Sequence, residues 1–499
     1  MELTDVGDRE TERVQAQSVW SPERRGLTLG LVATITLVAV ESLAVATILP
    51  DVKDDLGGLG LYGWVFSAFF LGSLVGVVVA GQTTDHRGPG AAYLMGLALF
   101  TLGLLAGGLA PSMLVLVLAR GVQGFGAGAV PATAYASIGR AYPEELRPRV
   151  FAILSTAWVV PGLLGPGLAG AVSNAFGWRW VFLGLVPLVL LAGTIAYRPL
   201  RPLRIEAAER PGPSGRLSGR RASRLPGALR VALGAGLVLA GLTADSFLYA
   251  VPLVLAGVVV GTPAFLRLVP KGTMRAEPGL PAAVLVRGAL TFAFFGADAY
   301  IPLAVTDARG STTLFAGLAL TATAISWTAG AWVQERLVYR VGARRFVMLG
   351  HAILLAGIAM ASLVLWDAVP LAVIAVAWAI AGFGVGMAYA PISLTVLREA
   401  PPGQEGTATS GMQLTDLLGV ALGTGFGGAA VALGEALGWD PARGIGIAWA
   451  MAGAMAVVGI FVARRLPGPE RPSEREAGPS VQTEHGGGVV AADGALTLG

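Results

Sequence analysis

Apolar segments recur along most of the chain, from Leu27 to Val462, and each is close to twenty residues long. A helix of this length crosses the hydrocarbon core of a bilayer, which is about 30 Å thick. We predict six spans in each half of the chain. They are 27–50, 61–82, 90–110, 112–138, 150–172 and 180–197, and then 284–306, 312–333, 346–364, 368–391, 406–432 and 444–463. The pattern predicts an all-α polytopic membrane protein with two pseudo-symmetric six-helix bundles.

A further apolar stretch, 231–266, lies between the two sets of spans and is interrupted by Ala244-Asp245-Ser246. About 36 residues are enough for two short helices of about 18 residues each. We therefore expect a two-helix hairpin that turns at Asp245, which gives fourteen transmembrane helices in total. The alternative is that this stretch lies along the membrane interface without crossing it.

Polar segments separate these apolar parts of the chain. The first residues lack the basic-then-apolar order of a signal peptide, and the tail is rich in Pro, Gly, Glu and Ser, which is typical of disorder. We expect the following organisation: an N-terminal segment 1–26, a six-helix bundle 27–197, a basic loop 198–230, a hairpin 231–268, a second six-helix bundle 284–463 and a disordered tail 467–499.

The composition agrees with a lipid environment and argues against several kinds of chemistry. Charged residues make up only 13% of the chain and hydrophobic residues 54%, whereas soluble proteins carry about 25% charged residues. Cysteine is absent, and the three histidines, His86, His351 and His485, are far apart, so we expect no metal site and no cofactor. No arginine stripe alternates with aromatic residues, so we expect no nucleic-acid partner.

The distribution of basic residues predicts the orientation in the membrane. If the N-terminus is cytoplasmic, 30 of the 35 Lys and Arg residues fall in cytoplasmic segments and Arg120 falls inside a span. Four remain for the outer loops: Lys53, Arg179, Arg309 and Arg443. Because cytoplasmic loops carry the excess of Lys and Arg, we expect a multi-pass protein of the cell membrane with both termini in the cytoplasm.

Two glycine-rich pieces, 124–128 and 382–386, look faintly like dinucleotide-binding loops. Both lie inside apolar helical runs, with no preceding strand and no acidic partner downstream. Small residues at such spacing, as at Gly72 and Gly76, let membrane helices approach closely, so we interpret all of them as packing sites. The phosphate-binding pattern G-x-x-x-x-G-K-[ST] does not occur, so this chain encodes no ATP-driven pump.

Ionisable residues inside the predicted spans are the main candidates for function, because each costs several kcal/mol there unless it is paired or hydrated. We identify Glu41, Arg120, Asp298 and Asp416. Glu41 and Asp298 each stand fifteenth in the first span of a half, which indicates an internal duplication with a site between the repeats. With a single base among the four, at least two acids need a proton or a bound cation. This favours proton coupling; the alternative is purely structural ion pairs or hydrogen bonds.

Several motifs resemble those of the major facilitator superfamily. The segment 81–88 resembles its signature loop G-x-x-x-D-R-x-G-R-R through Gly81, Asp85 and Gly88, although the basic positions are replaced. Glu41 lies nine residues before Pro50, and this spacing resembles the D-x-T-I-V-N-V-A-L-P motif of fourteen-span drug:proton antiporters.

Two more motifs strengthen the resemblance. Residues 118–124, which include Arg120, resemble the span-4 motif of the superfamily. Residues 161–170 resemble the span-5 motif of its antiporters through Gly165, Pro166 and Gly170. We expect Asp85 to cap the third span and latch one state, Pro166 to let the fifth span bend or pack tightly, and Arg120 to pair with Glu41.

The resemblance implies a function. We expect a secondary active transporter that exports lipophilic small molecules or drugs, cations among them, in exchange for protons by alternating access. Its expected partners are the substrate, protons and the bilayer, and the expected state is a monomer. Glu41, Asp298, Asp416 and Arg120 are the candidates for proton coupling. The candidates for the substrate cavity are Gln123, Gln413, Trp158, Tyr300, Trp327, Trp378 and Tyr389.

Other functions fit the residues less well. The runner-up is proton-coupled export of a lipid or glycolipid, and uptake by symport is disfavoured by the antiporter-like span 5. An intramembrane aspartyl protease built on Asp298 and Asp416 is disfavoured because neither acid lies in a Gly-x-Gly-Asp sequence. A passive channel is disfavoured because the acids do not form rings along a pore. We therefore expect a transporter and not an enzyme.

Overall fold

The computed structural model describes residues 18–22, 24–143, 146, 149–150, 153–154, 157, 159–201, 224–244, 246–401 and 404–468. The described residues form helices and no strands. The first half of the chain contains α2 (Arg25–Leu56), α3 (Tyr62–Arg87), α4 (Pro89–Gly108), α5 (Met113–Ala141), α7 (Val159–Phe176), α8 (Arg179–Leu183) and α9 (Leu185–Leu200). The second half contains α14 (Leu280–Asp298), α15 (Ile301–Leu303), the π-helix η5 (Ala304–Ala308), α16 (Thr313–Val341), α17 (Ala343–Leu363), α18 (Val373–Glu399), α19 (Glu405–Ala436) and α20 (Pro441–Ala463).

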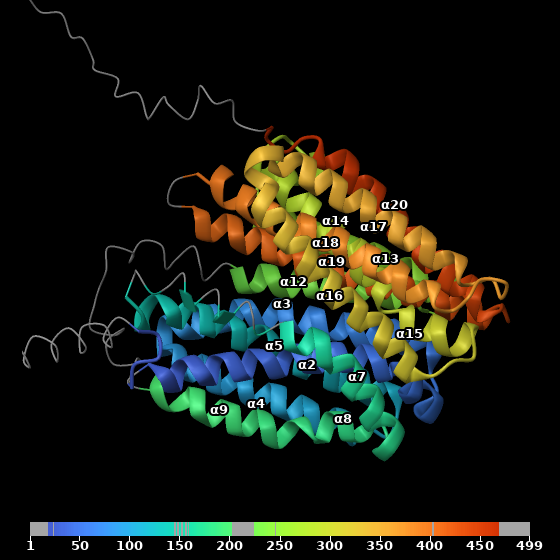
Figure 1. Ribbon diagram of the computed structural model, residues 1–499, viewed down its shortest axis with the longest axis horizontal. Coiled ribbons are helices and arrows are strands. Elements are labelled where there is room, and N and C mark those ends of the chain that lie inside the picture. Colours follow the sequence, from blue (N-terminus) through green and yellow to red (C-terminus); the bar gives the residue numbers. More distant parts are fainter. Residues whose placement is uncertain are drawn as a thin grey trace, which may run out of the picture.

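The helices of each half pack mainly on one another. In the first half, α5 packs on α3 and α4, and α2 packs on α7 and α9. In the second half, α18 packs on α16 and α17, and α14 packs on α19 and α20. Figure 1 shows the blue-to-green helices of the first half in the lower layer and the yellow-to-red helices of the second half in the upper one. The two halves meet where α3 packs on α19 and α7 on α16.

Thirteen helical segments of the described residues are long and apolar enough to cross a membrane. The fifth predicted span corresponds to α7, which is not one of the thirteen. The inserted stretch forms the expected hairpin, with α12 (Arg224–Leu242) packed against α13 (Phe247–Leu268). Asp245, where we expected the turn, lies outside the described residues, as do 1–17, 202–223 and 469–499.

The first span of the second half differs from the continuous helix that we expected over 284–306. The α-helix α14 ends at Asp298, and the chain continues through α15 and the π-helix η5. Pro302 explains the end of α14, because its ring clashes with the carbonyl of the residue four positions before it, which is Asp298. The helix end places the Asp298 carboxylate at an interruption of the backbone.

Glycines at the helix crossings have the packing role that the sequence predicts. A Cβ on Gly76 would overlap the carbonyl oxygen of Phe125, and one on Gly124 would overlap that of Phe69. In the second half, a Cβ on Gly384 would lie 2.5 Å from the carbonyl oxygen of Gly350. Both glycine-rich pieces therefore lie where two helix backbones touch, and neither forms a phosphate-binding loop.

Candidate functional site

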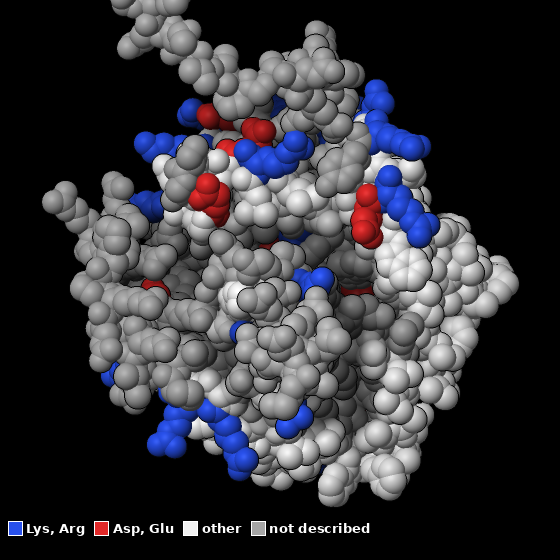
Figure 2. All heavy atoms as spheres, turned by 60° about the vertical axis from the view of Figure 1, so that its left-hand side comes forward, with Lys and Arg blue, Asp and Glu red and all other residues white. Residues whose placement is uncertain are grey.

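The bundle has two chemically different ends. We call the end that carries Arg25, Arg87 and Arg398 the basic end, and the opposite end the Lys53 end. Figure 2 shows Lys and Arg side chains around the described part of the basic end, with fewer acidic ones between them.

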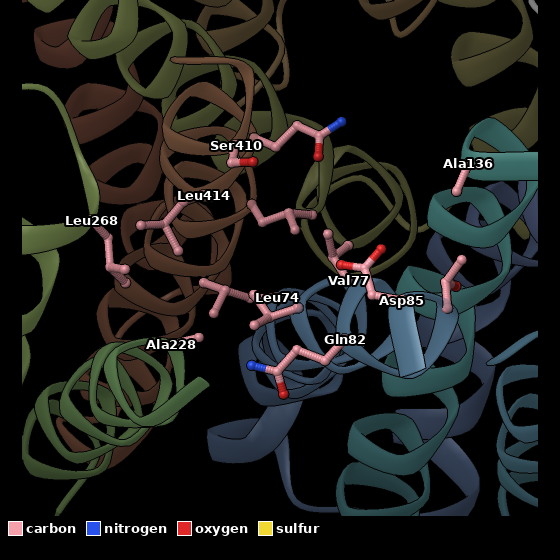
Figure 3. Close-up of a pocket in the computed structure, with 14 residues that line it drawn as sticks. Leu74, Val77, Gln82, Asp85, Ala136, Ala228, Leu268, Ser410 and Leu414 are labelled. Carbon is pink, nitrogen blue, oxygen red and sulfur yellow. The ribbon is translucent and has the colours of Figure 1, made fainter. Parts of the chain in front are cut away.

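A cleft with a volume of about 260 Å³ lies at the basic end between the two halves. The helix α3 lines it with Gln82 and Asp85, and α19 lines it with Leu414 (Figure 3). Gln413 of α19 also belongs to the lining. Gln413, one of the predicted cavity residues, is thus on the cleft wall.

The two halves are joined at the Lys53 end. Lys53 of α2 forms an ion pair with Asp307 of η5. Thr313 of α16 donates a hydrogen bond to Asp51 of α2 at 2.5 Å, and Ser173 of α7 donates to the same carboxylate. The Lys53–Asp307 and Thr313–Asp51 contacts run from the first half to the second, whereas Ser173 holds Asp51 from within the first half. The Lys53 end is therefore closed, while a cleft separates α3 from α19 at the basic end.

Glu41 and Arg120 form the predicted ion pair between α2 and α5. The Arg120 Nη1 atom also donates to Gln123 Oε1 at 2.7 Å, and Arg120 Nε donates to the Val65 carbonyl at 3.3 Å. The guanidinium lies 4.1 Å from the centre of the Phe69 ring. Glu41 and Arg120 are each 1% exposed, so the whole pair is enclosed within the first half.

Two polar atoms of this cluster have no hydrogen-bond partner among the described residues: Glu41 Oε2 and Gln123 Nε2. Arg120 holds only the other carboxylate oxygen, Oε1. Glu41 therefore has one oxygen bound to the guanidinium and one available to carry a proton. Gln123, predicted to face a cavity, instead serves this buried cluster.

Asp298 has a different environment in the second half. Its Oδ1 atom accepts a hydrogen bond of 2.7 Å from the indole nitrogen of Trp378 on α18. The Trp378 ring stacks on Phe294, with ring centres 5.8 Å apart and planes tilted by 14°. No basic side chain pairs with Asp298 among the residues that the structure describes.

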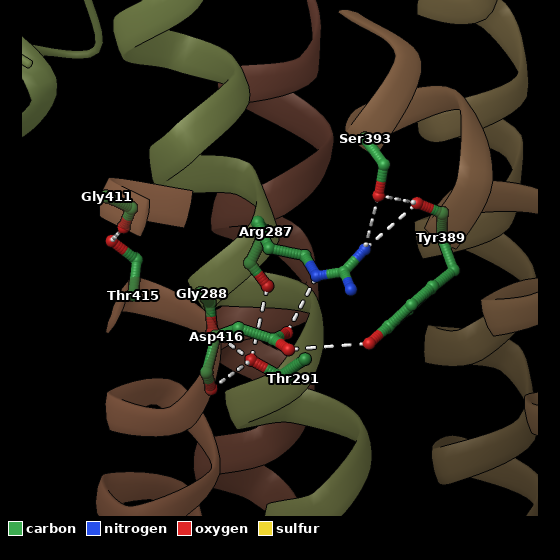
Figure 4. Close-up of polar contacts among 8 residues, drawn as sticks. All are labelled: Arg287, Gly288, Thr291, Tyr389, Ser393, Gly411, Thr415 and Asp416. Atoms are coloured by element: carbon green, nitrogen blue, oxygen red, sulfur yellow. Dashed lines mark hydrogen bonds and ion pairs between the residues drawn. The ribbon is translucent and has the colours of Figure 1, made fainter. Parts of the chain in front are cut away.

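Asp416 of α19 forms an ion pair with Arg287 of α14 at 2.7 Å (Figure 4). Arg287 Nη1 also donates to the Tyr389 carbonyl at 2.9 Å, and the guanidinium lies 3.1 Å from the centre of the Tyr389 ring. The Tyr389 hydroxyl donates to Asp416 at 3.4 Å. A charged residue, its counter-ion and an aromatic ring thus join three helices.

The expectation of a single buried base was wrong. Arg287, which is among the 30 basic residues counted above as cytoplasmic, lies eight residues into α14 and is 3% exposed. It is only the fourth residue of the predicted span 284–306, and positive charge is common at the cytoplasmic end of a span, so its burial could not be predicted from spacing. Two of the three acids have arginine partners, and Asp298 is the one without a basic partner in the described structure.

Aromatic rings connect the two acids of the second half. Trp327 contacts Phe294 and Tyr389, with ring centres 5.4 Å apart in each pair. The chain of rings therefore runs from Trp378 beside Asp298 to Tyr389 beside Asp416. Three of these rings were candidates from the sequence, and Phe294, which joins them, was missed because nothing in its sequence context separates it from other apolar residues.

Two other aromatic candidates lie elsewhere. Tyr300 is fully buried where the halves meet, and its hydroxyl donates to the Thr424 carbonyl at 2.5 Å. It is not among the residues that line the cleft. Trp158 lies outside the described residues.

Asp85 is not at the start of the third span, as we expected. It lies in the last turn of α3, and α4 begins after Gly88 without a side-chain cap. Gly88 has a φ of +82°, and Gly342 has a φ of +90° at the matching connection of the second half. Both residues have left-handed conformations that favour glycine, so the Gly88 of the motif is needed for the turn. Asp85 faces the cleft instead (Figure 3).

The motif at 161–170 lies on α7, where the two halves touch. A Cβ on Gly317 of α16 would lie 2.8 Å from the Pro166 carbonyl oxygen, and one on Gly170 would lie 3.2 Å from the Leu314 Cα. Gly165 approaches α2, because a Cβ on Gly165 would lie 3.8 Å from the Val40 carbonyl oxygen. The motif therefore supports tight packing between helices, one of the two roles that we considered.

Comparison with known proteins gives a consistent result. The family model described as Major Facilitator Superfamily matches residues 29–424 and 283–492. A probable multidrug-efflux transporter of Mycobacterium tuberculosis is 28% identical over 467 residues, which cover 89% of this chain and 96% of the relative. The multidrug transporter protein MdtP of Bacillus subtilis is 24% identical, with 80% of this chain and 74% of the relative covered.

Solved structures also resemble this chain in fold. A D-xylose-proton symporter superposes with a TM-score of 0.65 at 14% identity, and the match covers 89% of this chain and 98% of the symporter. The POT family transporter PepTSo gives a TM-score of 0.64 at 14% identity, and the match covers 88% of this chain and 97% of that transporter.

Proposed function

Because this chain belongs to the major facilitator superfamily, we propose that it exports lipophilic small molecules, cations among them, in exchange for protons. The family membership makes it a membrane transporter and not an enzyme. Two of the relatives are named for multidrug efflux or transport, and this supports the choice of substrate class. The excess of basic residues at the basic end favours placing that end in the cytoplasm of the cell, so the cleft is the entrance for substrate from inside.

The single observation that carries the proposal is the environment of Asp298. A carboxylate in a membrane helix without a counter-ion is costly. Within the described part of the chain, Asp298 has the Trp378 hydrogen bond and neighbouring aromatic rings but no basic partner. It is stable when a proton or a cationic substrate neutralises it. An aromatic wall attracts organic cations through the ring faces, so proton and cation compete for the same carboxylate, which is the exchange that an antiporter needs.

Glu41 is our candidate for the conformational part of the cycle. A proton on the partner-free Oε2 atom removes the charge that attracts Arg120. The pair between α2 and α5 then weakens, and the balance between the two states of the transporter shifts. One charge that crosses about 100 mV supplies about 2.3 kcal/mol, which sustains a concentration ratio of about fortyfold. One or two protons per cycle are enough for useful export.

The test is transport by purified protein in proteoliposomes with an imposed pH gradient. We expect the gradient to drive movement of tetraphenylphosphonium by the wild type, and Glu41→Gln to abolish the dependence on the gradient. Asp298→Asn should reduce transport of the cation at least tenfold while a neutral lipophilic substrate is affected less. Gradient-driven transport that is unchanged in Glu41→Gln would refute the coupling role, and a lipid or glycolipid accepted in place of all drug-like probes would favour lipid export.

A further inference from the structure

The inserted hairpin lies against the seam between the two halves. Leu71 of α3, Ala235 of α12 and Ala421 of α19 form a small apolar cluster with one residue from each helix. The indole nitrogen of Trp64 on α3 donates a hydrogen bond to Thr243 after α12 at 3.2 Å. A Cβ on Gly425 of α19 would overlap the Leu239 side chain of α12. The helix α12 thus contacts both halves where they meet.

Toward the basic end, the hairpin borders the cleft. Ala228 of α12 and Leu268 of α13 are part of the cleft lining, together with residues of α3 and α19 (Figure 3). Leu268 also lies beside α19, because a Cβ on Gly411 would be 3.4 Å from the Leu268 carbonyl oxygen. The cleft therefore has a wall that belongs to neither six-helix half.

The two helices of the hairpin form a rigid unit with one outward face. Gly234 of α12 and Gly257 of α13 let the two backbones approach so closely that a Cβ on either would clash with the other helix. Outer residues of α13 are highly exposed, for example Val259 at 70%. An apolar exposed face is expected next to lipid, so α13 presents this face to the bilayer.

We propose that the hairpin is the side wall of the substrate cleft, and that Ala228 and Leu268 are specificity-determining residues that limit substrate size. This inference rests on the proposed function, because it takes the cleft at the basic end, which is the substrate's entrance in that proposal, as a place where substrate binds before it reaches Asp298. The hairpin closes the opening between α3 and α19 toward the lipid, so substrate enters from the basic end. The cleft has a volume of about 260 Å³, just below the range of about 300–1,000 Å³ that is usual for ligand pockets. A larger side chain in its wall should therefore exclude bulky substrates.

The experiment uses the full chain and measures probe binding without a pH gradient, so that a failure of proton coupling leaves it intact. We compare Ala228→Trp with Leu229→Trp, the neighbouring position, whose side chain is 47% exposed on the outer face. We expect Ala228→Trp to weaken binding of tetraphenylphosphonium at least tenfold and binding of tetraethylammonium less than twofold. Leu229→Trp should change neither. Equal losses for the two probes, or no loss for either, would overturn the proposal.

A second variant should strengthen binding instead of weakening it, and a misfolded protein would not bind more tightly. Leu268→Ala enlarges the cleft, and we expect it to strengthen binding of tetraphenylphosphonium several-fold relative to tetraethylammonium. Chemical labelling of an introduced cysteine tests the same wall without a bound probe. The chain contains no cysteine of its own, so each variant carries a single reactive thiol. A charged methanethiosulfonate reagent should modify Leu268→Cys at least fivefold faster than Leu266→Cys, which lies on the outer side of the same turn. Equal rates would show that the hairpin does not face the cleft, whether or not the wild type binds either probe.

Discussion

At the scale of single residues, the three buried acids differ in what neutralises them. Glu41 and Asp416 each have an arginine partner on another helix, whereas Asp298 has an indole. Glu41 and Asp298 both lie on the first span of a half, and their partners lie on α5 and α18, the fourth span of each half. Equivalent positions of the two halves therefore carry a base in one and an aromatic donor in the other. We propose that this difference lets the second half accept a cation.

The Arg287–Asp416 pair gives a prediction about stability. Removing one partner of a buried ion pair leaves a charge without compensation and costs about 3 kcal/mol or more. We expect Arg287→Met and Asp416→Leu each to lower the unfolding free energy by about 3 kcal/mol, and the double variant to recover most of it. Chemical unfolding in mixed micelles measures the unfolding free energy of the wild type, the two single variants and the double variant. Additive losses in the double variant would show that the pair does not act as a unit.

Arg120 gives a prediction about coupling. Its guanidinium serves Glu41, Gln123 and the Val65 carbonyl at once, and a lysine ammonium lacks this planar set of donors. We expect Arg120→Lys to reduce proton-driven efflux at least tenfold. Arg443→Lys, at an exposed position of the Lys53 end, serves as the control and should transport like the wild type. Unimpaired coupling in Arg120→Lys would remove Arg120 from the mechanism.

At the scale of helices, small residues decide which surfaces can move past each other. The contact between α7 and α16 joins the two halves through glycines. Such a surface has few interlocking side chains, so it allows the halves to rock without breaking large contacts. The motif around Pro166 thus lies on a surface between moving bodies.

We expect Gly317→Ala to reduce transport at least fivefold, because its Cβ would lie 2.8 Å from the Pro166 carbonyl oxygen and would push α16 away from α7. Gly167→Ala is the matched control on α7, since a Cβ there meets nothing within 4 Å. It should transport like the wild type. Proteoliposome efflux measures both, and equal activity of the two variants would show that close packing of this surface is not needed.

At the scale of the whole molecule, the described contacts define one state of a transport cycle. The Lys53 end is held closed by contacts between the halves, and the basic end contains the cleft. Alternating access requires that the contacts at the Lys53 end break when the other state forms. The Lys53–Asp307 pair is therefore a latch of the present state.

Loss of this latch should shift the equilibrium toward opening at the Lys53 end. Both side chains of the pair are 16% exposed, and a pair near the surface is worth about 1 kcal/mol, which is about fivefold in population. We expect Asp307→Asn to raise the rate at which a water-soluble maleimide modifies Thr47→Cys by about fivefold. Asp367→Asn, whose carboxylate is 97% exposed within the second half, should leave the rate unchanged. A rise in both, or in neither, would contradict the latch.

The sequence alone determined the features that depend on local composition. The length of apolar runs predicts the helices, and the interruption at 244–246 predicts the hairpin, because a helix needs only its own residues to satisfy its backbone in lipid. The acid and base at Glu41 and Arg120 were predicted to pair, since buried charges need partners. The family could likewise be suggested from motif spacing.

Only the tertiary structure decided how charges and rings from distant helices meet. It placed Arg287 within the second half and next to Asp416, left Asp298 with an indole, and joined the rings through Phe294. It also put Asp85 on the cleft and the hairpin on the seam. These facts depend on helix rotation and on packing between different helices, whose contacting residues are 80 positions apart for Asp298 and Trp378 and 129 apart for Arg287 and Asp416. In a membrane helix the side that faces lipid and the side that faces protein are both apolar. The hydrophobic pattern of one helix therefore does not show which face packs against other helices.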